Sequence, residues 1–198
     1  MTETKAFGPT AILTPANGVT VARLIAAPVF GILVALEHNG PGSWPFFFVW
    51  TVLAVSDGLD GRIARWHGTT SSGAFLDPLA DKVLVLAALG ALADLGVIAV
   101  WPVVVIAVRE VAVSGFRVVA SRRGVSVPAR PLAKAKTLIQ DVAIGVAFIP
   151  AVGDHHHFVV QVLLDVAVAL TVISGLEYAW DARRTLGIGA QVSRGSVV

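Results

Sequence analysis

The chain has 198 residues, of which 56% are hydrophobic and only 14% are charged, with a formal net charge of +2. Soluble domains usually contain about 25% charged residues, and a domain of this length could not bury so much apolar surface and stay in solution. The composition excludes intrinsic disorder and a nucleic acid partner. The absence of cysteine excludes a disulfide scaffold, thiol catalysis and a thiolate metal site. The sequence therefore predicts an integral membrane protein.

Six long apolar runs follow one another along the chain, and a membrane-spanning helix needs about 20 such residues. Only a helix satisfies its own backbone hydrogen bonds in hydrocarbon. The runs cover residues 17–37, 44–66, 73–95, 98–120, 134–152 and 158–180. The predicted fold is therefore all-α, a polytopic membrane protein with six transmembrane helices in one domain, 17–183. Residues 1–16 are predicted to form an interfacial tail, and residues 184–198, rich in Gly and Ser, a flexible C-terminal tail.

Basic residues lie on one side only of the predicted spans. The connections 38–43, 94–99 and 151–157 contain no Lys or Arg, whereas the other connections and the tails contain most of the basic residues. Cytoplasmic loops of membrane proteins are enriched in Lys and Arg, so both termini are predicted to be cytoplasmic in a multi-pass protein of the cell membrane. The five tryptophans fall near predicted span ends, where interfacial aromatic belts form: Trp44, Trp50, Trp66, Trp101 and Trp180.

Four carboxylates stand in or beside the second and third runs, where each costs about 2.5–3.5 kcal/mol to insert. Asp57 and Asp60 are three residues apart, and Asp77 and Asp81 are four apart, so each pair lies on one helical face. Four carboxylates in a confined site need a compensating cation. Carboxylate oxygens suit Mg²⁺ or Mn²⁺, and two such ions could hold and activate a phosphate.

Two other interpretations of the four acids remain open. They could form interhelical salt bridges in a structural protein, or they could line the path of a divalent-cation carrier. A carrier should have acids through the full depth of the membrane, and Asp141 and Asp165 leave room for this alternative.

A second, basic set follows in the fourth and fifth runs. Arg109 and Arg117 lie eight residues apart on one helical face, and Lys134 and Lys136 open the next run. Buried arginine is costly, and phosphate is a common reason for it, so an acceptor substrate that carries a phosphate would fit. Alternatively, Arg109 pairs with Glu110, and the two lysines are cytoplasmic anchors. The histidines 155–157 are interpreted as a hydrated loop on the opposite side.

The acidic segment resembles the signature of the CDP-alcohol phosphotransferase family. It reads Asp57-Gly-Leu-Asp60-Gly61-Arg-Ile-Ala-Arg65, then Gly73-Ala-Phe-Leu-Asp77-Pro-Leu-Ala-Asp81. All eight defining positions are present, although the seven-residue gap before Gly73 is one residue shorter than usual. The resemblance implies a metal-dependent enzyme that displaces CMP from a CDP-linked lipid with an alcohol hydroxyl.

The same resemblance implies the roles of individual residues. Asp57, Asp60, Asp77 and Asp81 would bind the metal, and Asp81 would also deprotonate the acceptor. Asp57 and Asp60 would further contact the CDP moiety, together with Gly61 and Arg65. The active site would lie on the cytoplasmic side, and the family implies a homodimer.

The basic set is similar to a stretch of the bacterial phosphatidylglycerophosphate synthases within this family. The matching residues are Arg109-Glu110, Ser114, Arg117, Lys134-Ala-Lys136-Thr137 and Gln140, and the opening Asn17, Thr20 and Arg23 is also similar. Ala133 departs from the glycine common before the first lysine. The similarity implies CDP-diacylglycerol and glycerol 3-phosphate as substrates, with the acceptor phosphate bound by Arg109, Lys134, Lys136 and Arg117. Inositol phosphate and phosphatidylglycerol are the alternative acceptors.

Overall fold

The computed structural model describes the backbone of residues 15–67, 71–122 and 131–192, and the side chains of residues 18–56, 76, 78–122 and 131–180. All regular structure in this part of the chain is helical, which confirms the all-α prediction. The helices are α1 (Pro15–Ala35), α2 (Trp44–His67), α3 (Ser71–Asp94), α4 (Val100–Arg122), α5 (Pro131–Ala147), α6 (Pro150–Gly153) and α7 (His157–Val192).

The long helices begin and end close to the apolar runs, with two differences. The predicted run 134–152 is divided, because α5 ends at Ala147 and Pro150 opens the single turn α6. Proline lacks an N–H group and its ring clashes with the preceding turn, so it is favoured in the first turn of a helix, where Pro150 stands in α6, although Pro28 and Pro78 lie inside α1 and α3. The second difference is α7, which continues to Val192, into the segment 184–198 that the composition predicts as a tail. Ala, Arg and Leu favour helix after residue 180.

Within the described residues, two helical segments are long and apolar enough to cross a membrane by length and composition, Gly18–Ala35 and His157–Trp180. The segment Trp44–Ser56 of α2 is apolar but shorter. In α4 three charged residues, Arg109, Glu110 and Arg117, interrupt the apolar sequence. The two candidate spans fit the predicted membrane protein.

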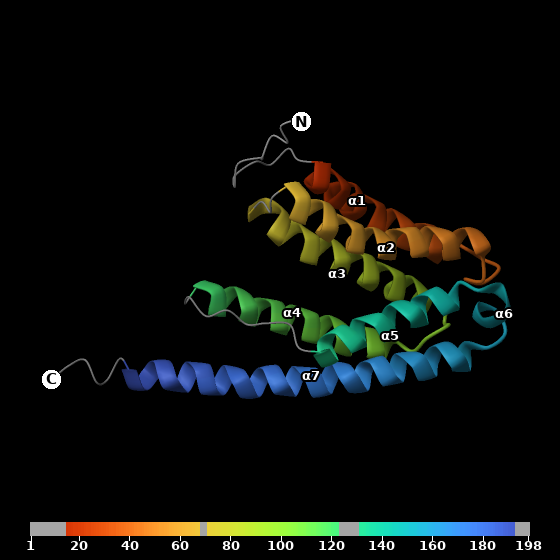
Figure 1. Cartoon of the computed structure of the whole chain (residues 1–198). Coiled ribbons are helices and arrows are strands. Elements are labelled where there is room, and N and C mark those ends of the chain that lie inside the picture. The colour runs from red at the N-terminus through yellow and green to blue at the C-terminus, as the bar shows by residue number, and fades with distance from the viewer. Residues whose placement is uncertain (1–14, 68–70, 123–130, 193–198) are drawn as a thin grey trace, which may run out of the picture.

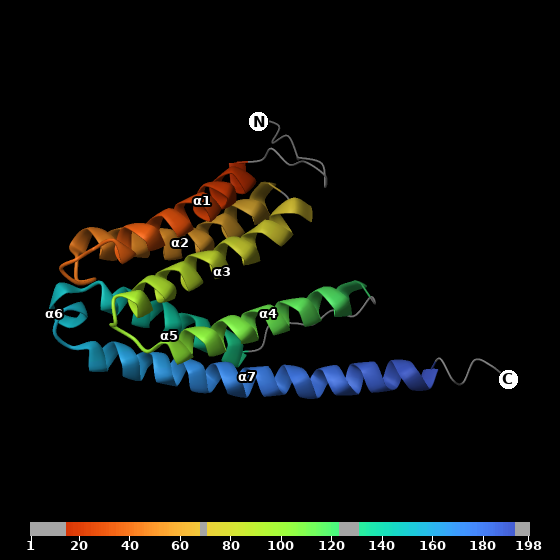
Figure 2. The same cartoon turned by 180° about the vertical axis from the view of Figure 1, so that it is seen from behind.

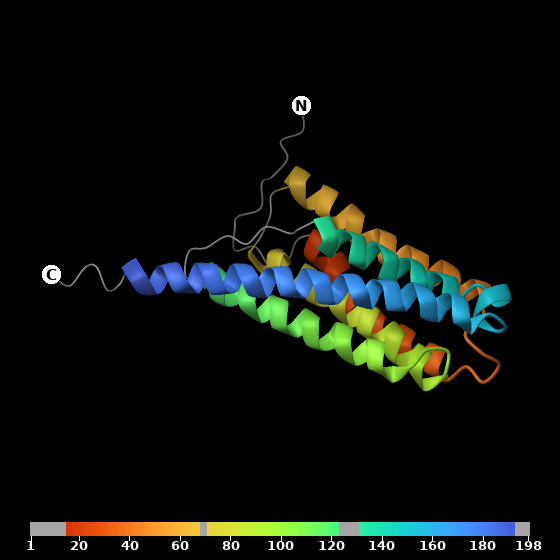
Figure 3. The ribbon, with the colours of Figure 1, turned by 90° about the horizontal axis from the view of Figure 1, so that it is seen from below.

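The long helices form a bundle in which helices that follow one another in the chain run in opposite directions, while the packed pairs α1–α3 and α4–α7 are parallel (Figures 1 and 2). α1 packs along α3, and α7 packs along both α5 and α4. The connections α1–α2, α3–α4 and α5–α7 gather at one end of the bundle, and Figure 3 shows α7 lying across α4 and α5 along its first half. The opposite end therefore contains the end of α2, the start of α3, the end of α4 and the start of α5.

Hydrogen bonds tie each of the three connections that contain no basic residue to a neighbouring part of the bundle. The Asp154 carboxylate accepts a hydrogen bond from the Gly42 N–H at 2.9 Å, and the Ser43 N–H donates to the Phe148 carbonyl at 2.9 Å. The Ala99 N–H donates to Gln161 Oε1 at 3.1 Å. These contacts fix the connections against one another and against α7.

The core contains an aromatic cluster, and one of its members corrects a prediction. Trp50 is buried, and it packs against Phe30 and Phe148 while its indole N–H donates to the Asp141 carbonyl at 3.2 Å. Its assignment to an interfacial belt was therefore wrong, because it lies on the inward face of α2. Trp44, Trp101 and Trp180 are exposed. The side chain of Trp66 lies outside the described residues.

Candidate active site

A cavity of about 450 Å³ lies between α3, α4 and α5. It lies toward the end of the bundle opposite the three connections that contain no basic residue, which we call the bare connections. Its walls combine acidic, basic and hydroxyl side chains with a few apolar ones. The lining residues are Pro78, Asp81 and Lys82 of α3, then Arg109, Glu110, Val113, Ser114 and Arg117 of α4, and Ala133, Lys134, Thr137, Leu138 and Asp141 of α5. A polar chamber is thus built inside otherwise apolar helices.

Only part of the predicted metal site lies within the described side chains. Asp81 lines the cavity from α3. Asp57, Asp60, Gly61 and Arg65 belong to α2 and Asp77 belongs to α3, but their side chains lie outside the described residues. Among the side chains that are described, no three of the types His, Asp or Glu come together. The predicted metal ligands are all aspartates, and carboxylate oxygens fit a hard divalent cation such as Mg²⁺.

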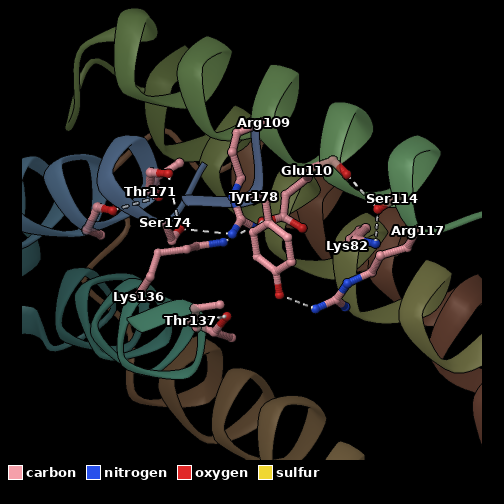
Figure 4. A network of polar contacts seen from close by, with 12 residues as sticks. Lys82, Arg109, Glu110, Ser114, Arg117, Lys136, Thr137, Thr171, Ser174 and Tyr178 are labelled. Atoms are coloured by element: carbon pink, nitrogen blue, oxygen red, sulfur yellow. Dashed lines mark hydrogen bonds and ion pairs between the residues drawn. The ribbon is translucent and has the colours of Figure 1, made fainter. Parts of the chain in front are cut away.

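Glu110 joins two cations on neighbouring helices (Figure 4). Its Oε1 atom lies 3.0 Å from Arg109 Nη1 on the same helix and 2.6 Å from Lys136 Nζ on α5. Lys136 is only 3% exposed, and Arg109 and Glu110 are also largely enclosed. A buried carboxylate between two cations fixes both of them, because each charge would be costly to bury alone.

Ser114 links α3 to the same network. The Lys82 ammonium donates a hydrogen bond to Ser114 Oγ, and the Ser114 hydroxyl donates to the backbone carbonyl of Glu110 one turn earlier. The lysine beside Asp81 is therefore held against α4, and this contact sets the width of the cavity between the two helices.

The second arginine of α4 is held by α7. Arg117 Nη2 lies 2.6 Å from the hydroxyl oxygen of Tyr178, and Arg109 Nη2 donates to Ser174 Oγ at 2.9 Å. The aromatic ring of Tyr178 lies under both guanidinium groups, with 5.7 Å from its centroid to the Arg109 Cζ atom and 5.3 Å to that of Arg117. Figure 4 shows Tyr178 between the two arginines.

The structure brings together most of the residues predicted to bind the acceptor phosphate. Arg109, Arg117 and Lys134 line the same cavity as Asp81. Lys136 does not line it. That side chain lies beside a smaller cavity that Asp81 and Gln140 also contact, with its ammonium group on Glu110. The pairing of Arg109 with Glu110, an alternative in the sequence, is present in the structure.

Sequence reasoning missed the contribution of α7. The last apolar run contains no recognisable motif, yet Ser174 and Tyr178 are buried in it and contact the two arginines. A weak signal was available, because these two polar residues lie four positions apart in an apolar helix and so share one face.

Two guanidinium nitrogens have no acceptor. Within the described part of the chain, Arg109 Nε and Arg117 Nε are buried and have no hydrogen-bond partner. Buried donors without partners are costly, and the large majority of such groups in proteins are paired. Because both Nε atoms are closed off from the cavity, a phosphate bound there would contact the other nitrogens of the two guanidinium groups.

Comparisons with known proteins agree with this chemistry. The model of the CDP-alcohol phosphatidyltransferase family matches residues 13–173. A probable phosphatidylglycerophosphate synthase of Mycobacterium tuberculosis strain H37Rv is 40% identical over 176 residues, which are 87% of this chain and 83% of that protein.

Two further relatives carry the name CDP-diacylglycerol–glycerol-3-phosphate 3-phosphatidyltransferase. The Bacillus subtilis protein is 34% identical over 85% of this chain and 96% of its own length. The Rickettsia bellii protein is 35% identical over 82% of this chain and 91% of its own length. With a family match over most of its length and relatives at this level of identity, the chain belongs to the CDP-alcohol phosphatidyltransferase family and is an enzyme.

Proposed function

We propose that the protein transfers the phosphatidyl group of CDP-diacylglycerol to sn-glycerol 3-phosphate, giving phosphatidylglycerophosphate and CMP. Relatives that match most of the chain bear the name of this activity. The observation that carries the proposal is the composition of one cavity. A carboxylate that can take a proton, Asp81, shares its walls with Arg109, Arg117 and Lys134, which can bind a phosphate.

The acidic motif would hold the metal and the nucleotide. Enzymes of the family generally depend on a divalent metal. In the proposed site Asp57, Asp60, Asp77 and Asp81 bind Mg²⁺ or Mn²⁺ as two ions, and Gly61 and Arg65 contact the CDP moiety along with Asp57 and Asp60. The ions, when bound, neutralise the charge of the pyrophosphate and of the transition state.

Asp81 is proposed as the general base. Its carboxylate accepts the proton of the glycerol 3-phosphate hydroxyl, and the hydroxyl oxygen then forms a bond to the phosphorus that carries diacylglycerol. The bond from that phosphorus to the CMP oxygen breaks, and CMP leaves with the electron pair. Positioning and charge neutralisation dominate such transfers, so the fixed cations of α4 and α5 are suited to the task.

The acceptor phosphate is proposed to bind Arg109, Arg117 and Lys134, with an indirect contribution from Lys136. The first three can reach a ligand in the large cavity directly. Lys136 acts indirectly. Its ammonium group neutralises Glu110, so the charge of Arg109 remains available to the phosphate. Among the described residues, the cavity wall has four cations, Lys82, Arg109, Arg117 and Lys134, and three carboxylates, Asp81, Glu110 and Asp141, so its formal charge is positive.

The proposed topology has six membrane spans in one domain, 17–183, with the active site and both termini in or facing the cytoplasm. The long helices alternate in direction, and the three connections without basic residues lie together at the end far from the cavity. Basic residues at the cavity end fit the positive-inside rule. We propose a homodimer, as the resemblance to the CDP-alcohol phosphotransferase family implies.

The test is CMP release by purified protein with CDP-diacylglycerol and Mg²⁺, supplied separately with glycerol 3-phosphate, inositol phosphate or phosphatidylglycerol. Release with glycerol 3-phosphate alone, lost on chelation, supports the proposal. Release with only one of the other two would keep the chemistry and overturn the acceptor. No release with any of them from folded protein would favour a divalent-cation carrier, which a metal-flux assay in vesicles would detect.

Substitution of the proposed base sharpens that assay. Asp81→Asn should lower the rate of CMP release by at least about 100-fold, since a general base contributes roughly 10²–10⁴-fold. Asp94→Asn is the matched control, because Asp94 is exposed at the far end of the same helix. Full activity of Asp81→Asn would rule out the carboxylate as the base.

A further inference from the structure

α7 presents a buried polar face to the rest of the bundle. Thr171 and Ser174 are fully buried and Tyr178 is 2% exposed, in a helix that is otherwise mostly apolar. The three residues are spaced three and four positions apart, so they lie in one row along the helix. Polar groups buried in an apolar helix need a compensating hydrogen bond. The hydrogen-bond partners of these three residues therefore indicate the function of the row.

Hydrogen bonds within α7 leave the Ser174 hydroxyl oxygen free to accept a hydrogen bond from α4. Thr171 Oγ1 donates to the Ala167 carbonyl, and Ser174 Oγ donates to the Thr171 carbonyl at 3.1 Å. With its own proton used on α7, the Ser174 hydroxyl oxygen accepts from Arg109 Nη2 at 2.9 Å. The opposite nitrogen of the same guanidinium group, Nη1, is held by Glu110. Arg109 is therefore fixed at both ends of its planar head.

Tyr178 binds Arg117 through its hydroxyl group, and its ring lies near both Arg109 and Arg117. Its hydroxyl oxygen lies 2.6 Å from Arg117 Nη2, and its ring centroid lies 5.3 Å and 5.7 Å from the Cζ atoms of Arg117 and Arg109. A cation near an aromatic ring is attracted by the quadrupole of the ring. Tyr178 thereby contacts both cations from the α7 side of the cavity.

We propose that Ser174 and Tyr178 are positioning residues for the acceptor. They hold the guanidinium groups of Arg109 and Arg117 from the α7 side, so that the remaining N–H groups meet a phosphate ester in the cavity. Both arginines line the cavity together with Asp81 and Lys134, which supports this arrangement. The inference rests on the proposed function. It adds that affinity for the acceptor is set by a helix that contributes no lining residue to the large cavity.

Tyr178→Phe is the central variant, because it removes one hydroxyl and keeps the ring. Loss of a hydrogen bond to a charged group should raise the KM for glycerol 3-phosphate about five- to tenfold. The kcat and the KM for CDP-diacylglycerol should stay within about twofold of wild type, since the nucleotide site is not touched. Leu176→Ala is the matched control, because Leu176 lies between the two residues on α7 but is 65% exposed.

A double-mutant cycle separates positioning from general packing. If Tyr178 acts through Arg117, Tyr178→Phe should have no further effect on the KM for glycerol 3-phosphate in an Arg117→Met background. Ser174→Ala with Arg109→Met gives the corresponding cycle for the other arginine. Ser174→Ala is a small change, so it also tests the inference if Tyr178→Phe lowers the thermal stability of the protein in detergent.

The outcomes distinguish this inference from the proposed function. Wild-type protein that releases no CMP with glycerol 3-phosphate would overturn the proposed function and, with it, the acceptor role of the arginines. Active wild-type protein with an unchanged acceptor KM in both Tyr178→Phe and Ser174→Ala would overturn the positioning role alone. Additive effects in both cycles would do the same, because the residues would then act independently of the arginines.

Discussion

Glu110 is the residue on which the charge balance of the cavity depends. Its Oε1 atom contacts both Arg109 and Lys136, and Lys136 is almost completely buried. Glu110→Gln should destabilise the fold by about 2–4 kcal/mol, because it leaves two enclosed cations without their shared counter-charge. Thermal or denaturant unfolding in detergent would measure the change, with Asp94→Asn as an exposed control. Lys136→Met should restore part of the lost stability in the Glu110→Gln background, and failure to do so would contradict the pairing.

For single residues, the sequence identifies which side chains belong to the site better than it identifies their contacts on other helices. A carboxylate or arginine inside an apolar run is conspicuous because of its cost, so Asp81, Arg109 and Arg117 could be identified without a structure. The burial of Lys136 could not, because its partner lies 26 positions away on another helix. Tyr178 was missed for the same reason, since its contact with Arg117 spans 61 positions. The side chains of Asp57, Asp60 and Asp77 are not described, so their roles stay predictions.

The pairing of α1 with α3 depends on a glycine. A Cβ atom on Gly31 would lie 2.9 Å from the Ala87 Cβ atom and 3.0 Å from the Ala87 carbonyl oxygen. Small residues at such contacts let helix backbones approach closely in membranes. Gly31→Val should therefore push the two helices apart and lower stability by about 1–3 kcal/mol, as overpacking does.

The control for that prediction lies on the partner helix. Gly90 of α3 is exposed, and a Cβ atom there would meet nothing within 4 Å. Gly90→Ala should leave the stability unchanged or raise it by roughly 0.5–1 kcal/mol, because alanine loses less backbone entropy in a helix. Unfolding midpoints in one detergent would compare the two variants. Equal stability of Gly31→Val and wild type would show that the α1–α3 contact can shift freely.

The helices themselves were largely predictable because apolar continuity is a local property. The break between α5 and α6 was not, although Pro150 stood in the sequence. Apolar neighbours on both sides, such as Ile149 and Val152, kept the hydrophobic run continuous, and a proline alone does not mark a helix end, since Pro28 and Pro78 lie inside α1 and α3. The burial of Trp50 could not be predicted either, because a position near a span end does not tell which face of the helix points inward.

For the whole molecule, the proposed topology can be tested on the natural sequence, which contains no cysteine. Asn39→Cys and His155→Cys, in exposed positions of the bare connections, should react with a membrane-impermeant maleimide on intact cells. Arg122→Cys, exposed at the end of α4, should react only after the membrane is permeabilised. The cysteine-free protein gives the background. Labelling of Arg122→Cys on intact cells would reverse the proposed orientation.

The length of α7 gives a measure of where in the bilayer the chemistry takes place. At 1.5 Å per residue, Tyr178 lies about 32 Å along the helix from His157, close to the roughly 30 Å thickness of the hydrocarbon layer. The remaining turns, to Val192, would extend about 21 Å further, beyond the acyl chains. In the proposed topology, Arg117, which Tyr178 binds, would therefore lie near the level of the lipid head groups. A doubly charged, water-soluble ester would then reach this arginine from the aqueous phase, while a lipid partner would arrive at the same depth by lateral diffusion.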